Sequence, residues 1–189
     1  MYTEAAPLAS PQRATSTGAT LQLDELLAYA PDQLRRLYEA ASVPRLDAVS
    51  GDLRGRMLAW PKAGARTSRA LRALASADRF PWRGKSFVPH VDGGVSRAGE
   101  GINRVGVDAL RLFRFETFVG KSRAGDFEAV QLDYDLPENP FYIRAVKDEI
   151  RELRAGLYLG QAWLAARGKE HLVLYFALED RRVRACAPS

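Results

Sequence analysis

The pattern of apolar residues changes from a helical period to alternation near residue 81, and this change constrains the fold more than any other feature of the chain. Two pairs of alternating segments follow, each pair separated by a short polar stretch, and each pair predicts a β-hairpin. A further short alternating segment precedes them. The predicted strands are residues 82–88, 108–120, 128–136, 157–165 and 171–179.

The last of these segments, HLVLYFALE, carries large apolar residues on both faces, so it must be covered on both sides. Burying each large apolar side chain contributes roughly 1.5–3 kcal/mol. A curled sheet that is filled by side chains inside and partly covered by helices outside meets this requirement. We therefore predict a mainly β fold, a small closed or nearly closed antiparallel barrel. The alternative is an open sheet with helices on one face, of α+β type.

The first 80 residues are predicted to be mostly helical. Residues 1–20 lack a hydrophobic period and are rich in Ala, Ser, Thr and Pro, which predicts a flexible tail. Pro31 stands where a helix begins, because proline is tolerated at the first helical position. Helices are predicted at 24–30, 31–41 and 68–80, and a strand or linker at 51–60. The chain from 21 to 189 is predicted as one domain, with a helical part at 21–80 and a barrel part at 81–185.

A further helix is predicted at about 139–154, before the last hairpin. Asn139 and Pro140 provide a start signal, and Gly156 provides the left-handed residue that ends a helix. The helix would bury one apolar stripe and pair three charged residues on its surface, with Glu149 on the flank of the stripe and directed toward the barrel rim. The stripe is Ile143, Val146, Ile150 and Leu153, and the charged residues are Arg144, Asp148 and Arg151.

The segment RAVKDEIRELRAGLYLG, residues 144–160, is preceded by LDYD and followed by a strand that ends YFALE. It resembles bacterial small β-barrel proteins of calycin-like appearance, over about residues 82–180. The most specific residues of this resemblance are Asp148, Glu149, Ile150, Arg151, Gly156, Tyr158, Leu159 and Gly160. The resemblance implies a barrel that holds a ligand, with a helix across one end, and it implies no particular reaction.

The charge distribution bears on the partners of the protein. The net charge is +5, and residues 51–130 hold 15 Lys and Arg against 8 Asp and Glu. A basic surface of this kind would suit nucleic acid, but the charges are dispersed and no nucleic-acid-binding motif is present. We interpret them as solvated faces of strands and helices, and do not expect a nucleic-acid partner.

The cellular location is predicted from three absences in the sequence. No apolar run approaches the roughly 18 residues that a membrane-spanning helix requires, and the first 20 residues lack the features of a signal peptide. The single cysteine, Cys186, cannot form an internal disulfide, which suits a reducing compartment. We expect a cytoplasmic protein without membrane contact.

The candidate ligand site is an interior cavity, predicted to open near residues 93–104, a glycine-rich segment interpreted as a loop over the barrel mouth. Aromatic residues would line it, and Arg104 or Arg114 would face an acidic or carbonyl group of the guest. Asp133 and Asp135 are preferred as exterior charges. The predicted ligand-binding residues are Arg104, Phe113, Arg114, Phe115, Glu116, Tyr134, Glu149, Tyr158, Trp163 and Tyr175.

No motif in the chain specifies a reaction. His90 and His171 have no spacing typical of a metal site or a catalytic triad, so no metal or cofactor is expected. We therefore predict a protein that binds a small hydrophobic or amphipathic molecule inside the barrel. The alternative is a cofactor-independent cyclase or isomerase acting on a flexible hydrophobic substrate. A third hypothesis is an interaction module that uses the basic middle of the chain.

Overall fold

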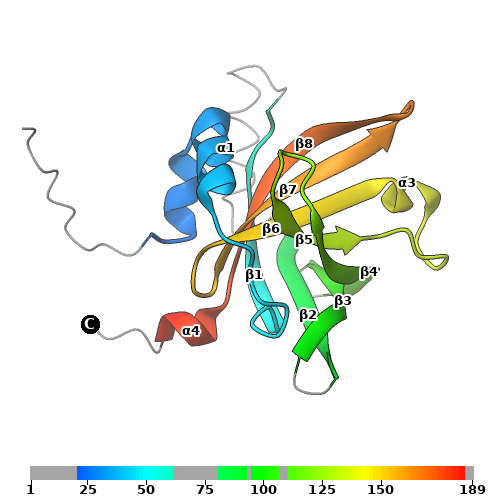
Figure 1. Cartoon of the computed structure of the whole chain (residues 1–189), viewed down its shortest axis with the longest axis horizontal. Helices are drawn as coiled ribbons and strands as arrows, with labels where there is room; N and C mark the ends of the chain where they lie inside the picture. The colour runs from blue at the N-terminus through cyan, green and yellow to red at the C-terminus, as the bar shows by residue number, and fades with distance from the viewer. Residues whose placement is uncertain (1–20, 62–80, 93–94, 107–109, 186–189) are drawn as a thin grey trace, which may run out of the picture.

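The computed structural model describes residues 21–61, 81–92, 95–106 and 110–185, in which eight strands close into an antiparallel barrel (Figure 1). Each strand pairs with the next along the chain, and the last strand pairs with the first. The prediction of a small antiparallel barrel is therefore confirmed. The strands are β1 (Gly51–Ala59), β2 (Trp82–Asp92), β3 (Val95–Val105), β4 (Leu110–Lys121), β5 (Glu128–Asp133), β6 (Val146–Arg154), β7 (Leu157–Ala166) and β8 (Lys169–Glu179).

Two N-terminal helices cover one side of the barrel from outside (Figure 1). They are the 3-10 helix η1 (Asp24–Ala28) and the helix α1 (Pro31–Ala40), which has Pro31 at its first position as predicted. Leu34 and Tyr38 of α1 are fully buried against the outer face of β7 and β8. This packing explains why β8 is apolar on both sides. The predicted tail at 1–20 and the predicted helix at 68–80 lie outside the described residues.

The first barrel strand lies in the part of the chain that was predicted as mainly helical. β1 pairs with β2 on one side and with β8 on the other, so residues 51–59 form a strand and not a linker. The sequence does not show a clear alternation of apolar and polar residues in β1, because Gly55 stands where an apolar side chain would be expected. The indole ring of Trp82 occupies the space next to Gly55, so a larger residue does not fit there. The boundary predicted between a helical part and a barrel part at residue 80 is therefore wrong.

The glycine-rich segment 93–103 was predicted as a loop, and over its described residues, 95–103, this prediction is also wrong. Residues 95–105 form β3, which pairs with β2 and β4. Glycine is read as a loop signal, but here it makes room for a side chain. A Cβ on Gly101 would lie 2.4 Å from the ring of Phe115, so only glycine fits at this point in the strand.

The helix predicted at 139–154 is wrong in its length and in the pairing of its charged residues, although all four residues of its predicted apolar stripe pack in the hydrophobic clusters. The structure has a four-residue helix, α3 (Phe141–Arg144), followed directly by β6. Arg144 forms an ion pair with Asp135, and not with Asp148. Gly156 does adopt the left-handed conformation, with φ of 71°, but in the turn between β6 and β7.

The misassignment of β6 has a physical cause. Asp148 and Ile150 point into the barrel, whereas Glu149 and Arg151 lie beneath covering segments on the outer face, and all four are buried. A strand that buries charged residues on both faces shows no clean alternation of apolar and polar residues. The Glu, Lys, Arg and Leu that make up this segment favour helices, and tertiary packing overrides that preference.

The interior of the barrel is filled at only one end. Large apolar side chains pack there together with the segment 42–50, which leads into β1. The C-terminal helix α4 (Arg181–Ala185) follows β8 at the same end, where Arg182 donates a hydrogen bond to the carbonyl oxygen of Ser50. The members of this filled half include Leu46, Val49, Leu53, Phe87, Val130, Leu132, Ile150, Tyr158 and Leu178.

Among the described helices, none is long and apolar enough to span a membrane.

Candidate functional site

The other end of the barrel contains a cavity of about 390 Å³. This volume lies within the range of roughly 300–1,000 Å³ that is typical of small-molecule sites. Every strand except β5 lines it with residues from the end opposite to the filled half, and Ile143 of α3 and Tyr134 at the end of β5 complete the wall. The lining residues are Met57, Pro81, Trp82, Lys85, Asn103, Val105, Phe113, Tyr134, Ile143, Val146, Asp148, Ala162, Leu174 and Phe176.

The cavity therefore opens at the end of the barrel opposite to the one predicted. The last described pair of β2 and β3, Asp92 with Val95, lies at the far end of both strands from the lining residues Trp82 and Val105. The helix between β5 and β6 was expected to lie across one end of the barrel, and α3 does lie at the cavity end. Its contribution to the wall is the apolar side chain of Ile143, not a charged group.

Four polar side chains form a layer between the cavity and the filled half: Lys85, Asn103, Tyr134 and Asp148. Their backbone positions follow from strand alternation. Lys85 precedes Phe87 on the inner face of β2, and Asp148 lies between Val146 and Ile150 on the inner face of β6. Both charged residues are nearly inaccessible, Lys85 at 2% and Asp148 at 5% exposure.

Lys85 is at the centre of this polar layer. Its Nζ donates to Asp148 Oδ2 at 2.9 Å, to Asn103 Oδ1 at 2.8 Å and to the hydroxyl of Tyr134. These three acceptors use all three protons of an ammonium group. The rings of Trp82, Phe115, Tyr134 and Phe176 surround the same nitrogen, with centroids 5.2 to 5.6 Å away. The aromatic rings and the carboxylate both favour the charged amine.

Burial acts against that charge. It lowers the pKa of Lys85 below its ordinary value, and the carboxylate of Asp148 partly offsets this effect. Burial also raises the pKa of the Tyr134 phenol well above its ordinary value, and the negative charge of Asp148 adds to the increase. Tyr134 therefore remains a protonated hydrogen-bond donor at any physiological pH.

The other hydrogen-bond donors of the layer and of Trp82 also have acceptors. The Tyr134 hydroxyl donates to Asp148 Oδ2 at 3.0 Å and accepts from Asn103 Nδ2 at 3.1 Å. Asn103 Nδ2 also donates to the carbonyl oxygen of Phe113, and Asn103 Oδ1 accepts from the indole nitrogen of Trp82 at 3.0 Å. Asp148 Oδ1 alone in this layer is buried without a hydrogen-bond partner among the described residues.

Phe113 is held at the cavity by an irregularity in β4. Ile102 pairs with Arg114 and Asn103 pairs with Leu112, so Phe113 is the extra residue of a β-bulge. Its φ of 60° is left-handed, which is rare for a bulky residue, and such strain is concentrated at functional sites. The bulge directs Phe113 into the cavity wall and its carbonyl oxygen toward Asn103.

The structure brings four of the ten predicted ligand-binding residues into the barrel. Phe113 and Tyr134 line the cavity. Phe115 lies just below it, with its ring centroid 5.3 Å from that of Tyr134. Tyr158 belongs to the filled half, where its hydroxyl donates to the carbonyl oxygen of Ala48.

The other six predicted residues lie on the outer face of the barrel. Arg104 is next to the inward-facing Asn103, so it points outward and forms an ion pair with Asp52. Arg114 is exposed and pairs with Glu100, and Glu116 is exposed as well. The prediction that an arginine faces the guest is therefore wrong, and the cation in the cavity wall is Lys85. The predicted residues found outside are Arg104, Arg114, Glu116, Glu149, Trp163 and Tyr175.

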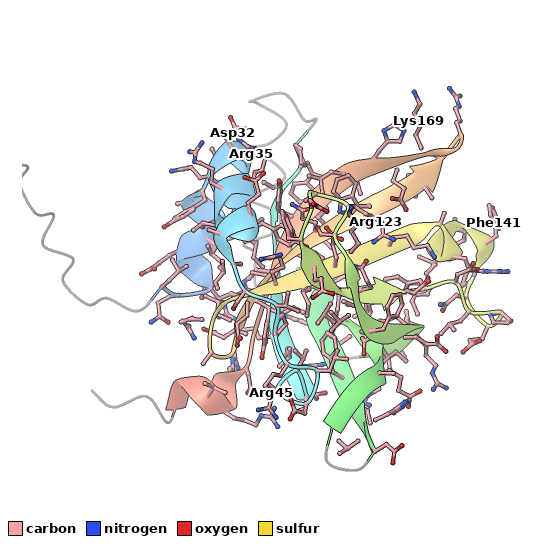
Figure 2. All side chains as sticks on the ribbon, viewed as in Figure 1. Asp32, Arg35, Arg45, Arg123, Phe141 and Lys169 are labelled. Carbon is pink, nitrogen blue, oxygen red and sulfur yellow. The ribbon has the colours of Figure 1, made fainter. Side chains whose placement is uncertain are left out.

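Glu149 belongs to a second buried polar cluster, outside the barrel wall. Its carboxylate accepts from the Ser122 hydroxyl at 2.8 Å and from the backbone N–H of Arg123 at 3.0 Å, and it is fully buried. Arg123, labelled in Figure 2, follows β4, and its guanidinium donates to Gln131 and Glu170. This cluster fixes the β4–β5 turn to β6, so Glu149 has a structural role rather than a place at the rim.

Two more residues that were predicted to line the cavity lie outside the barrel. Trp163 follows the inward-facing Ala162 and is opposite Lys147, so it lies outside. Tyr175 is buried beneath the N-terminal helices. Asp133 was preferred as exterior, and this is confirmed by its ion pair with Lys147 on the outer face. Among the described side chains, no group of three or more His, Cys, Asp and Glu residues lies close enough together to hold a metal ion.

Comparison with known proteins gives little further information. No protein-family model matches the chain, and no curated protein matches it. A solved structure of a protein from Thermomonospora curvata is similar, with 16% sequence identity and a TM-score of 0.47. The similarity covers 80% of this chain and 87% of that chain. At this level it bears on neither site nor activity, which rest on the cavity itself.

Proposed function

We propose that the protein binds a small amphipathic molecule in the cavity of its barrel. The observation that carries this proposal is the pairing of an apolar wall with one buried hydrogen-bond acceptor that has no partner, Asp148 Oδ1, in a residue that lines the cavity. Ten of the lining residues are apolar, and the four polar ones form the layer around Lys85. Sites of this composition bury most of a ligand's surface and use a few polar groups to fix its orientation.

The lining residues of a cavity of this size make fewer packing contacts with one another than the residues of the filled half do. The filled half shows that the same chain packs its interior closely where no space is needed. The bulge at Phe113 and the buried charges of Lys85 and Asp148 add local free-energy costs. A ligand that fills the cavity restores the missing packing contacts, and this favours a binding role.

The test uses the neutral dye Nile red, whose fluorescence rises in an apolar site. We expect saturable binding with one site per chain. Ala162→Phe, which places a ring in the cavity, should abolish it, whereas Ala165→Phe on the exposed outer face should not. Circular dichroism of both variants should show an intact barrel. Equal binding by the two variants, or none by the wild type, would refute the proposal.

One observation favours a second function, a cofactor-independent isomerase. The carboxylate of Asp148 has one oxygen without a partner, and a single base of this kind can take a proton from one carbon of a bound substrate and return it to another. Such a reaction needs no oxidant or reductant. Native mass spectrometry of the freshly purified protein would identify a co-purified guest. A change in that guest's structure on incubation with fresh protein, absent with Asp148→Asn, would support the enzyme.

A further inference from the structure

The hydrogen-bond count of the polar layer specifies what kind of head group the cavity accepts. We infer that the ligand's polar end is an uncharged hydrogen-bond donor, a hydroxyl or N–H group, that donates to Asp148 Oδ1. This inference rests on the proposed binding function and names the ligand class for the same site.

The hydrogen-bond donors of the polar layer are already used within the layer. Lys85 has three acceptors for its three protons, and the Tyr134 hydroxyl donates once and accepts twice. Both donors of the Asn103 amide and the indole N–H of Trp82 are also used. No donor of the layer is free to bind a carboxylate, a phosphate or a carbonyl oxygen. The one buried group of the layer without a hydrogen-bond partner among the described residues is an acceptor, Asp148 Oδ1.

The charges of the polar layer exclude a charged head group. Lys85 and Asp148 form a close pair at 2.9 Å, so together they contribute no net charge to the site. An anionic head group would meet the lone pairs of Asp148 with no free cation to balance it. A cationic head group at Asp148 Oδ1 would lie close to the ammonium of Lys85 in apolar surroundings. Both arrangements leave a buried charge uncompensated, which is strongly unfavourable.

A buried carboxylate oxygen without a partner loses its hydration and gains nothing in return. A molecule that fills the apolar wall but lacks a donor leaves that cost in place. The same molecule with a hydroxyl group removes it, and this difference is the source of the selectivity.

The experiment compares molecules with one ten-carbon chain and different ends, as competitors that displace Nile red at neutral pH. They are decan-1-ol, decanoic acid, decylamine and decyl methyl ether, which represent a neutral donor, an anion, a cation and a neutral molecule without a donor. We expect decan-1-ol to displace the dye at a concentration at least about tenfold lower than the other three, as expected for satisfying one buried acceptor.

Two variants make the assignment specific to the pair. Asp148→Asn leaves Lys85 as an unbalanced cation, so decanoic acid should become the best competitor. Lys85→Met/Asp148→Leu removes both charges, so the four competitors should differ only by their hydrophobicity while Nile red still binds. The double variant replaces the pair with apolar side chains of similar size, so it should fold even if Asp148→Asn does not.

The outcomes separate this inference from the proposed function. If Nile red does not bind the wild type, the proposed function fails. If Nile red binds and the acid or the amine competes as well as the alcohol, the cavity binds ligands but the inferred head group is wrong. The same conclusion follows if the ether equals the alcohol, or if the double variant keeps the wild-type preference.

Discussion

The buried pair of Lys85 and Asp148 allows a quantitative test of how this barrel tolerates charge in its interior. At the observed 2.9 Å, and with an effective dielectric constant of about 20, the attraction is about 6 kcal/mol. Replacing one partner leaves the other charge buried and unpaired, which typically costs about 3–5 kcal/mol. We therefore expect Asp148→Asn to lower the free energy of unfolding by about 3–5 kcal/mol, measured by urea unfolding and circular dichroism.

The sign of the pH dependence follows from the pKa of Lys85, which burial lowers. A neutral amine needs no counter-charge, so the deficit of Asp148→Asn should shrink as the pH rises and Lys85 loses its proton. The control is Glu39→Gln, which removes the partner of Arg35 at a similar distance, 3.0 Å, on the exposed face of α1. Its urea midpoint should equal that of the wild type, because exposed pairs contribute little.

The double variant Lys85→Met/Asp148→Leu completes a double-mutant cycle. Its loss of stability should be smaller than the sum of the losses in Lys85→Met and Asp148→Leu by about 2 kcal/mol or more, since each single change leaves one unpaired charge and the double change leaves none. Additive losses would refute the reasoning. So would a cost below about 1 kcal/mol for Asp148→Asn, because a cost that small is typical of a solvated pair.

Three further predictions follow from the packing. A Cβ on Gly160 would lie 2.2 Å from the ring of Phe176 in the cavity wall, so Gly160→Ala should cost about 1–3 kcal/mol in urea unfolding and weaken Nile red binding. Gly120→Ala, whose nearest contacts are at 3.3 Å with side chains of the outer face, should cost less and leave Nile red binding unchanged. Ile150→Asp should abolish the cooperative thermal transition, since it places a charge in the filled half of the barrel; a native-like melting curve would contradict this. Burial raises the pKa of Tyr175 to about 12, so its contribution to stability is complete below the ordinary value of 10.0 and is lost as the pH rises toward 12. The part of the phenolate absorbance that comes from Tyr175 should therefore appear only together with alkaline unfolding. Ionisation of every tyrosine while the protein is still folded would contradict the burial.

The barrel was predictable from the sequence because several strands follow an alternating or doubly apolar pattern. β4, β5, β7 and β8 show it clearly, and their two hairpins are confirmed. β1 and β3 were missed as barrel strands because glycines at inward positions interrupt the pattern. β6 was missed because its charged residues are buried on both faces, which no single-strand pattern reveals.

The candidate site was less predictable than the fold. Phe113 and Tyr134, which were predicted as ligand-binding residues, do line the cavity, since each shares a strand face with other large apolar residues. Lys85 and Asp148 were not, because a charge on a strand is normally taken as solvated. The sequence nevertheless contained a signal. Lys85 and Asp148 each share a strand face with an apolar residue two positions later, Phe87 and Ile150, and their charges have opposite signs. Only the closed barrel brings those two faces together.

The closing of the ring by β1 and β8 also affects how the chain is made. A ribosome releases β1 long before β8, and Arg182 and Ser50, which bond across this seam, are 132 positions apart. Until residues 169–179 emerge, the nascent chain has an unpaired edge on β1 and another on β7, and such edges attract other chains. Pairing of segments so distant in sequence is slow compared with local folding. Any truncation that removes β8 leaves both edges permanently open, so the resulting chains should associate through them rather than accumulate as monomers.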